Sequence, residues 1–518
     1  MADYFTDHVD VVVIGAGQNG LIAADYLKRT GLTVLVVERR LESGGGLTGE
    51  EPTINGFWHT TGNPFQDLAA ILPFMTDLDL ARYNGRWITP TVQSSLPLPD
   101  GRWLVIHSEL ERTLASIAAI SPRDAQRWRS IVGAFNADLP AIRAHLCAPP
   151  GDPAHKDYER SGYGALVAAA SDKTPLEVLD ETFDSDAVKA LVLMHLAAPR
   201  GVGWDYQGAG AVVPLAVALA GDNRLAAGGV HELAQALWSA CIHGDGDVWD
   251  STIVSRILVD EGRAVGVELS GGRKVSARAV ISSVDLQTTF LELIEQAQVP
   301  RELARRVREF EADEYSIFAV HLALREPPRF GDADAGRAFR VNLGIDSPAA
   351  VRTLWQEIRS GALPQQTAMT VFSTVIWDPS QAHKGMSNTT VWQFVPRRLA
   401  SGEWASARDS YARELIERLR RFAPNVTDDC ILESVAHTPD LMVQKWPNLK
   451  AGIFGGRNAG SQLLSMRPFA ELTHRSPIPG LYLANASMAP GVGLSGVAGV
   501  RAAHAVAEVL GARITLGS

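Results

Sequence analysis

Residues 9–38 read VDVVVIGAGQNGLIAADYLKRTGLTVLVVE, and this stretch decides the fold. Its two ends, Val9–Ile14 and Leu32–Val37, are short runs of mainly β-branched residues, a pattern typical of strands buried on both faces. A glycine-rich turn and a helix-like segment separate them, and Glu38 follows directly after the second run. This order of strand, turn, helix, strand and acid predicts an α/β fold with a Rossmann-like dinucleotide-binding domain.

The turn carries a GxGxxG motif, and each of its glycines has a physical role. Gly15 permits the tight turn, Gly17 lets a pyrophosphate approach the backbone, and Gly20 allows the helix to pack closely on the strand. Gln18 and Asn19 begin the helix, whose free N–H groups and positive dipole end favour phosphate. The motif therefore predicts that all five residues, Gly15, Gly17, Gln18, Asn19 and Gly20, contact a nucleotide cofactor.

The segment after the second strand favours FAD over NAD. The Glu38 carboxylate can accept both hydroxyls of an adenosine ribose, and it disfavours a 2′-phosphate there. A glycine cluster, Gly44–Gly46, follows six to eight residues later. Here the chain resembles the FAD-dependent amine-oxidase and phytoene-desaturase superfamily, specifically phytoene dehydrogenase-like oxidoreductases. The resemblance implies that Arg39, Gly45 and Gly46 also lie at the cofactor.

The C-terminal segment resembles the same superfamily. Pro477–Ala484 predicts a strand, which leads through a glycine-rich turn to a helix that begins near Gly496. The resemblance implies that the N-terminus of this helix points at the isoalloxazine ring, where only small residues fit. The implied cofactor contacts are Ser487, Gly493, Gly496 and Val497. The superfamily usually has Gly-Ala-Gly-Thr-His-Pro before this turn, whereas this chain has Asn-Ala-Ser-Met-Ala-Pro at 485–490.

Two further site residues come from the middle of these blocks. The strand-like run from Thr252 to Val259 resembles the strand that contacts adenine in the superfamily, which implies a backbone contact from Val254. The stretch GFWHTTG at 56–62 resembles the segment that passes the flavin and lines the substrate cavity. His59 is its ionisable residue and is the candidate acid or base, while a packing or hydrogen-bonding role is the alternative.

The blocks of resemblance predict two interleaved lobes, as expected for a chain of 518 residues,. An FAD-binding lobe comprises residues 1–108, 226–290 and 441–518. An α+β substrate-binding lobe comprises residues 109–225 and 291–440.

Composition limits the partners and the location. The net charge is −10, with 58 acidic and 48 basic residues, which argues against nucleic acid as the main partner,. Three cysteines and an acidic N-terminus without an apolar core predict a cytoplasmic protein,. The longest apolar run, Ala209–Gly221, predicts either a buried helix or a face that dips into a bilayer, so peripheral membrane contact stays open,.

The motifs predict an enzyme. The sequence contains no HExxH, GxSxG, Walker lysine or metal-type cysteine–histidine cluster, which argues against hydrolases and phosphotransferases and predicts no metal site,. The expected function is FAD-dependent dehydrogenation or desaturation of a hydrophobic, isoprenoid-like small molecule by hydride transfer to flavin N5. An external acceptor, oxygen or a quinone, would reoxidise the flavin. The alternatives are a flavin amine oxidase, a flavin-dependent isomerase and an FAD-binding module without turnover.

Overall fold

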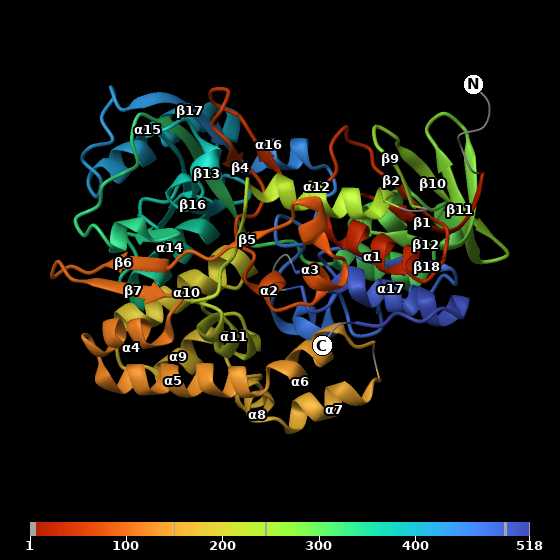
Figure 1. The fold of residues 1–518 in the computed structure, drawn as a ribbon, viewed down its shortest axis with the longest axis horizontal. Coiled ribbons are helices and arrows are strands. Elements are labelled where there is room, and N and C mark those ends of the chain that lie inside the picture. Colours follow the sequence, from red (N-terminus) through yellow and green to blue (C-terminus); the bar gives the residue numbers. More distant parts are fainter. Residues whose placement is uncertain (1–6, 150, 244–245, 492–494, 517–518) are drawn as a thin grey trace.

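The computed structural model describes residues 7–149, 151–243, 246–491 and 495–516. Within these residues two seven-stranded sheets and a layer of helices make up most of the molecule (Figure 1). One sheet lies on the right of the view, the second at the upper left, and the helices of residues 110–200 lie below.

The first sheet is the predicted dinucleotide-binding sheet. Its strands run in the order β10-β11-β12-β1-β2-β9, and β18 pairs with β12. The strands are β1 (His8–Ile14), β2 (Val34–Val37), β9 (Gly246–Trp249), β10 (Val254–Asp260), β11 (Arg263–Leu269), β12 (Lys274–Ser282) and β18 (Leu481–Leu483). The pairs β9–β2, β2–β1, β1–β12 and β12–β18 are parallel, while β10–β11 and β11–β12 are antiparallel.

Apolar side chains of β1 and β2 feed a core on each face of this sheet. On one face Val11 and Val13 pack with α1 (Gln18–Lys28), α12 (Val230–Ile242) and α17 (Val497–Leu510). On the other face Val12 and Ile14 pack with the β10–β11 hairpin and α13 (Arg301–Glu309). Burial on both faces explains why the strands read as continuous apolar runs. The prediction of an α/β, Rossmann-like fold is confirmed.

The second sheet is mostly antiparallel and has the order β17-β13-β16-β15-β14-β6-β7. Its strands are β6 (Val92–Pro97), β7 (Trp103–His107), β13 (Tyr315–Leu324), β14 (Arg340–Leu343), β15 (Met369–Ser373), β16 (Ser387–Pro396) and β17 (Ile431–His437). Strands β6 and β7 belong to this sheet through β14, although the predicted boundary at residue 108 placed them in the FAD-binding lobe. The two lobes thus exchange chain earlier than the sequence indicated.

A helical layer lies beside the second sheet (Figure 1). It contains α4 (Leu110–Ala118), α5 (Pro122–Ala137), α6 (Leu139–Cys147), α7 (Pro153–Arg160), α8 (Gly162–Ala169), α9 (Pro175–Thr182), α10 (Asp186–Arg200) and α11 (Val213–Ala218). Helices α14 (Pro348–Ser360), α15 (Trp404–Arg420) and α16 (Pro439–Lys445) complete the second lobe.

The apolar run Ala209–Gly221 lies inside this helical layer. It forms a short 3-10 helix, Ala209–Val212, followed by α11, and residues such as Val213 and Val217 are fully buried. The run is therefore core, and the prediction that it offers a face to a bilayer is wrong.

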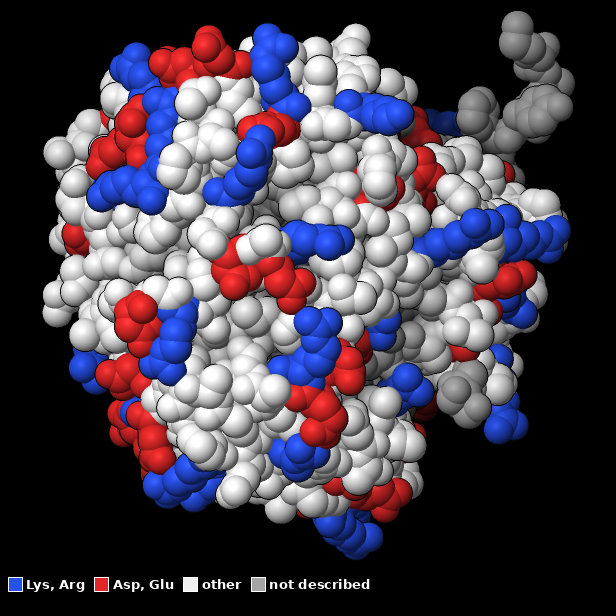
Figure 2. Space-filling model, turned by 60° about the vertical axis from the view of Figure 1, so that its left-hand side comes forward, with Lys and Arg blue, Asp and Glu red and all other residues white. Residues whose placement is uncertain are grey.

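The described part of the chain has no helix that is both long and apolar enough to cross a membrane. On the face shown in Figure 2, basic and acidic side chains are intermixed.

Candidate functional site

A cavity of about 220 Å³ opens where the glycine turns after β1 and β2 meet the C-terminal segment and the second lobe. Its described lining has two ends of different chemistry. The polar end consists of glycines and small polar residues: Gly17, Gln18, Asn19, Gly45, Gly46, Thr61, Gly62, Asn63, Ser283, Asp285, Asn485, Ala486, Ser487 and Gly491. The apolar end consists mainly of aliphatic and aromatic residues: Ala198, Pro199, Ile317, Trp392, Met442, Trp446, Leu449, Ala451, Ile453 and Phe454.

Two glycine turns touch each other backbone to backbone at the polar end. The Gly44 N–H donates to the Ala16 carbonyl over 2.8 Å. A Cβ at Gly45 would lie 3.0 Å from the Gly17 Cα, so a larger residue would push the turns apart. A Cβ at Gly20 would lie 2.1 Å from the Gly15 carbonyl oxygen, which confines that position to glycine. The motif thus sets the spacing of helix and strand, as its sequence predicted.

Gly17 differs from these glycines because the space beside it is open. It is the N-cap of α1 with an extended backbone, at φ −74°, which any residue can adopt. A Cβ there would meet no atom closer than the Gly45 Cα at 3.8 Å. The open space lies on the cavity side, where the first N–H groups of α1 have no side-chain cap. This is the geometry of an anion-binding helix N-terminus.

Glu38 lies at the end of β2 and is almost fully buried. Its Oε2 accepts from the Ala16 N–H and its Oε1 from the Arg40 N–H, both over 2.8 Å. The Thr252 N–H donates to the Glu38 carbonyl oxygen, which brings the start of β10, with Val254, close to the acid. Arg39 is exposed beside it. Glu38, Arg39 and Val254 lie together but outside the described lining of the cavity.

The C-terminal contacts are divided in the same way. Ser487 lines the polar end, whereas Gly496 and Val497 begin α17 outside the lining. A Cβ at Gly496 would lie 2.5 Å from the Ile22 Cδ1, so this glycine allows α17 to pack on α1. Gly493 lies outside the described residues.

Buried polar groups at the polar end lack partners within the chain. Both side-chain polar atoms of Gln18 and the Nδ2 of Asn485 are buried without a hydrogen bond. Such groups are costly to leave unsatisfied, so they fit a bound molecule that offers both donors and acceptors. A dinucleotide with phosphate, ribose and amide groups meets this requirement. Together with the open space at Gly17, these atoms show that the residues present fit FAD.

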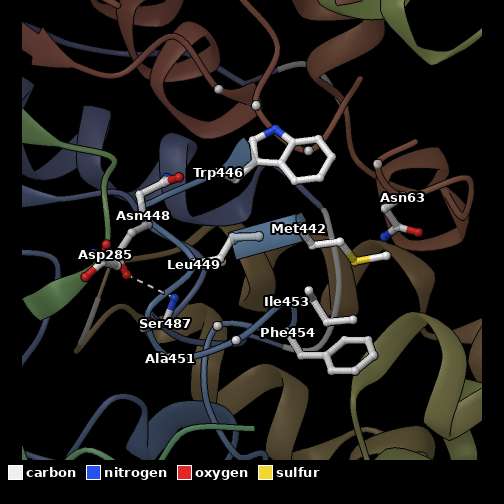
Figure 3. A pocket seen from close by; sticks show the side chains of 18 of the residues that line it. Asn63, Asp285, Met442, Trp446, Asn448, Leu449, Ala451, Ile453, Phe454 and Ser487 are labelled. Atoms are coloured by element: carbon white, nitrogen blue, oxygen red, sulfur yellow. Dashed lines mark hydrogen bonds between the residues drawn. The ribbon is translucent and has the colours of Figure 1, made fainter. Parts of the chain in front are cut away.

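Five separate segments of the second lobe and the C-terminal region build the apolar end (Figure 3). Ile317 comes from β13, Trp392 from β16 and Met442 from α16. Pro199 comes from the end of α10, and Phe454 from a loop after α16. No element supplies this wall alone, because each contributes one or two side chains.

Asp285 is the only ionisable side chain in the described lining, and it lies at the polar end. It accepts hydrogen bonds from the Thr288 N–H and hydroxyl, and burial raises the pKa of its carboxyl group. The apolar end therefore offers no charge to a ligand. A protonated amine would meet no carboxylate there.

His59 does not line the cavity, although it stands in the segment expected to do so. Thr61 and Gly62 of the same segment do. The His59 ring is buried, its Nε2 lies 3.1 Å from the Thr53 hydroxyl, and its centroid lies 5.2 Å from that of His321. Burial, with a smaller effect from His437, lowers the pKa of His59 to about 3. Its catalytic role stays a prediction.

Sequence reasoning missed most of the apolar end and part of the polar end. Asn63, Asp285 and Asn485 carried no motif of their own, although Asn63 directly follows the quoted GFWHTTG segment. The large side chains looked like ordinary core residues. Only their convergence from distant elements distinguishes them from the core.

The fold and the two-part cavity define a dinucleotide-binding enzyme with a separate apolar substrate space. The model of the family "Flavin containing amine oxidoreductase" matches residues 130–507, and the chain belongs to this family. A model of the Thi4 family matches residues 1–52, which hold the first glycine motif. The cofactor is FAD and the protein is a flavin-dependent oxidoreductase, as the sequence predicted.

Named relatives agree with this assignment. A limonene dehydrogenase polypeptide of Castellaniella defragrans is 31% identical, over 98% of this chain and 95% of that protein. A lycopene-forming phytoene desaturase of Paracoccus is 24% identical, over 96% of both chains. The predicted resemblance to phytoene dehydrogenase-like proteins is confirmed. An oxidoreductase of Methanosarcina mazei shares the fold at a TM-score of 0.61 and 17% identity, over 96% of this chain and 100% of that one.

Proposed function

We propose that this protein dehydrogenates an uncharged, apolar small molecule of the isoprenoid class. One observation carries the proposal: the apolar end of the cavity directly adjoins the glycine turns and contains no ionisable side chain among its described residues. An apolar pocket with few polar groups gains its affinity from burying apolar surface. The relatives named for limonene dehydrogenase and phytoene desaturase act, by their names, on terpenoid hydrocarbons.

The polar end would hold FAD through residues from three parts of the chain. The N–H groups after Gly17 and the Gln18 side chain would face the pyrophosphate, and Gly45 and Gly46 would let it pass,. Glu38 would accept the ribose hydroxyls, next to Val254 on the adenine side. Asn485 and Ser487 would meet the flavin end.

Bound FAD supplies the redox chemistry, because its isoalloxazine ring can accept a hydride at N5 from a substrate C–H bond. The residues of this chain supply position and environment. The apolar side chains exclude water from the reacting bond and hold the substrate against the polar end. An external acceptor, oxygen or a quinone, would complete the cycle.

The test is anaerobic bleaching of the flavin in the purified holoenzyme against a panel of compounds. The panel contains limonene, longer linear isoprenoids, and primary amines of similar size. We expect bleaching by at least one hydrocarbon and none by the amines, because the apolar end offers no carboxylate. Bleaching by amines alone would establish the amine-oxidase alternative and overturn the proposal. A hydrocarbon converted to a product of equal mass, without bleaching, would establish an isomerase instead.

A further inference from the structure

One wall of the apolar end is a loop that cannot hold its own shape. This wall loop, residues 451–456, reads AGIFGG. Its glycines at 452, 455 and 456 all have positive φ, of 103°, 76° and 107°. Glycine adopts these angles freely, and it also leaves the unfolded and alternative states of a loop highly populated. Because residues 451–455 line the cavity, something outside the loop must fix them.

A buried carboxylate holds the N–H groups of the wall loop. The Asp313 Oδ2 accepts from the Phe454 N–H over 2.7 Å, and its Oδ1 accepts from the Gly456 N–H over 2.9 Å. The Asp313 N–H in turn donates to the Ala451 carbonyl over 2.7 Å. A Cβ at Gly452 would lie 2.2 Å from the Asp313 Oδ2, so the carboxylate occupies space that only a glycine leaves open.

A buried guanidinium holds the carbonyl groups of the same loop. The Arg467 Nη2 donates to the Gly455 carbonyl over 2.7 Å, and its Nη1 donates to the Gly456 carbonyl over 3.2 Å. Arg467 is 1% exposed, and the described residues provide no ion pair for it. Its charge is thus spent on backbone oxygens, several of them in or just after the wall loop.

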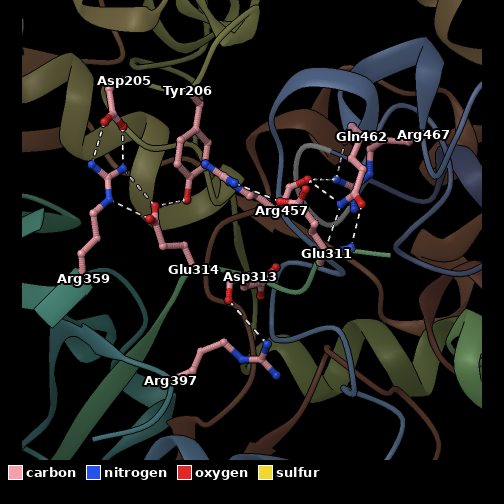
Figure 4. A network of polar contacts seen from close by, with 10 residues as sticks. All are labelled: Asp205, Tyr206, Glu311, Asp313, Glu314, Arg359, Arg397, Arg457, Gln462 and Arg467. Carbon is pink, nitrogen blue, oxygen red and sulfur yellow. Dashed lines mark hydrogen bonds and ion pairs between the residues drawn. The ribbon is translucent and has the colours of Figure 1, made fainter. Parts of the chain in front are cut away.

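The two buried ions belong to a larger polar network at the junction of the lobes (Figure 4). Glu311, two residues before Asp313, receives the Arg457 N–H at its carbonyl oxygen and Arg457 Nη1 at its carboxylate. Glu314, the next residue, accepts from Arg359 and from the Tyr206 hydroxyl instead. Of these three acidic neighbours, Asp313 alone bonds the wall loop at two of its N–H groups.

We propose that Asp313 and Arg467 are positioning residues for substrate: they fix the wall loop from its two sides and so set where Ile453 and Phe454 meet an apolar ligand. The inference rests on the proposed function, because it assigns the apolar end to the substrate. Neither residue lines the cavity, so each acts through the loop. Two charge-assisted hydrogen bonds to backbone N–H groups are worth more than neutral ones, and they are directional.

The carboxylate also makes the position of the loop sensitive to pH. Burial raises the pKa of Asp313 to about 6, against the opposing effects of the two N–H groups, Arg397 and Arg467. The other groups that face it are the hydroxyls of Tyr206 and Tyr315, whose pKa values burial raises above their ordinary value. Below pH 6 the protonated carboxyl accepts hydrogen bonds more weakly. Affinity for an apolar ligand should then fall.

The experiment measures limonene binding to the holoenzyme through the change in the flavin absorbance spectrum. For Asp313→Ala we expect a Kd for limonene at least 10-fold higher, with the Kd for FAD changed less than twofold. Asp313→Asn keeps one acceptor oxygen, so it should fall between and bind equally at pH 5 and pH 7.5. The wild type should bind more weakly at pH 5. The matched control is Glu314→Gln, which has the same chain location and no bond to the wall loop.

Hydrogen–deuterium exchange of the holoenzyme adds a readout that needs no ligand. Exchange at the Phe454 and Gly456 amides should rise in Asp313→Ala and stay unchanged in Glu314→Gln. Unchanged limonene binding in Asp313→Ala, or loss of FAD from it, would overturn the positioning role. If wild-type holoenzyme binds neither limonene nor a longer isoprenoid, the proposed function falls first, and the inference falls with it.

Discussion

The two ends of the cavity differ in how the chain builds them. At the polar end, neighbouring residues of a few glycine-rich segments supply most contacts, and their backbone does much of the work. At the apolar end, single side chains from β13, β16, α10, α16 and the wall loop converge. A cofactor shared by many enzymes can be held by a local motif, whereas a substrate space depends on the relative placement of distant elements. The following predictions test whether this division of labour is real.

The largest effect should come from filling the open space beside Gly17. In Gly17→Ala the backbone is unstrained and the Cβ meets no protein atom closer than 3.8 Å, so the apoprotein should fold normally. The methyl group would crowd the pyrophosphate, and overpacking of this kind costs about 1–3 kcal/mol. We expect FAD affinity to fall by up to about 100-fold, measured by fluorescence titration of the apoprotein. Gly133→Ala, also with open space around its Cβ, is the control and should bind FAD normally.

A smaller loss should follow Glu38→Gln. Hydrogen bonds to a charged acceptor exceed neutral ones by about 1 kcal/mol or more, so FAD affinity should fall by about 10-fold. Isothermal titration of apoprotein with FAD would show it. Glu42→Gln, in the exposed turn that follows, should leave the Kd unchanged. If Glu38→Gln binds FAD as the wild type does, the carboxylate serves only the N–H groups of Ala16 and Arg40.

Ile453→Ala should affect the apolar end alone. Removing part of a cavity-lining side chain loses about 1 kcal/mol of apolar contact, which corresponds to an approximately 5-fold weaker limonene complex. FAD affinity should stay within twofold of the wild type. Ile253→Ala, at a position 48% exposed and outside the described lining, is the matched control. Equal loss of FAD and limonene binding would mean that the two ends do not act separately.

The smallest effect on turnover should come from His59, which lies at neither end. His59→Asn should change kcat by less than twofold, measured with whichever compound bleaches the flavin. Its pKa of about 3 lies below the ordinary 6.5, so the neutral ring stabilises the fold above pH 6.5. That stability is lost as the pH falls toward 3, about 2 kcal/mol of it by pH 5.

Urea unfolding at pH 7 and pH 5 would measure this slope for His59. The slope should be shallower in His59→Asn than in the wild type, because the variant has no ring to protonate. A large fall in kcat with an unchanged slope would instead restore His59 as an acid or base.

The sequence predicted the cofactor lobe well because its signals are local. Alternating faces of β1 and β2, the glycines at fixed spacing and the acid after β2 all lie within about thirty residues. The same reasoning failed at the lobe boundary, because the pairing of β6 with β14 joins residues more than two hundred positions apart. It also misjudged Ala209–Gly221, since apolar residues read the same whether they face a core or a membrane,.

By itself, the sequence determined the dinucleotide-binding unit, FAD as cofactor and the class of oxidoreductase. Backbone conformation and helix termini make that unit, and residue type dictates both over short distances. Only the tertiary structure decided which side chains form the apolar end, that His59 lies outside the described cavity lining, and that Asp313 and Arg467 hold the wall loop. These features depend on contacts between elements far apart in the chain, and such contacts exist only once both sheets are packed.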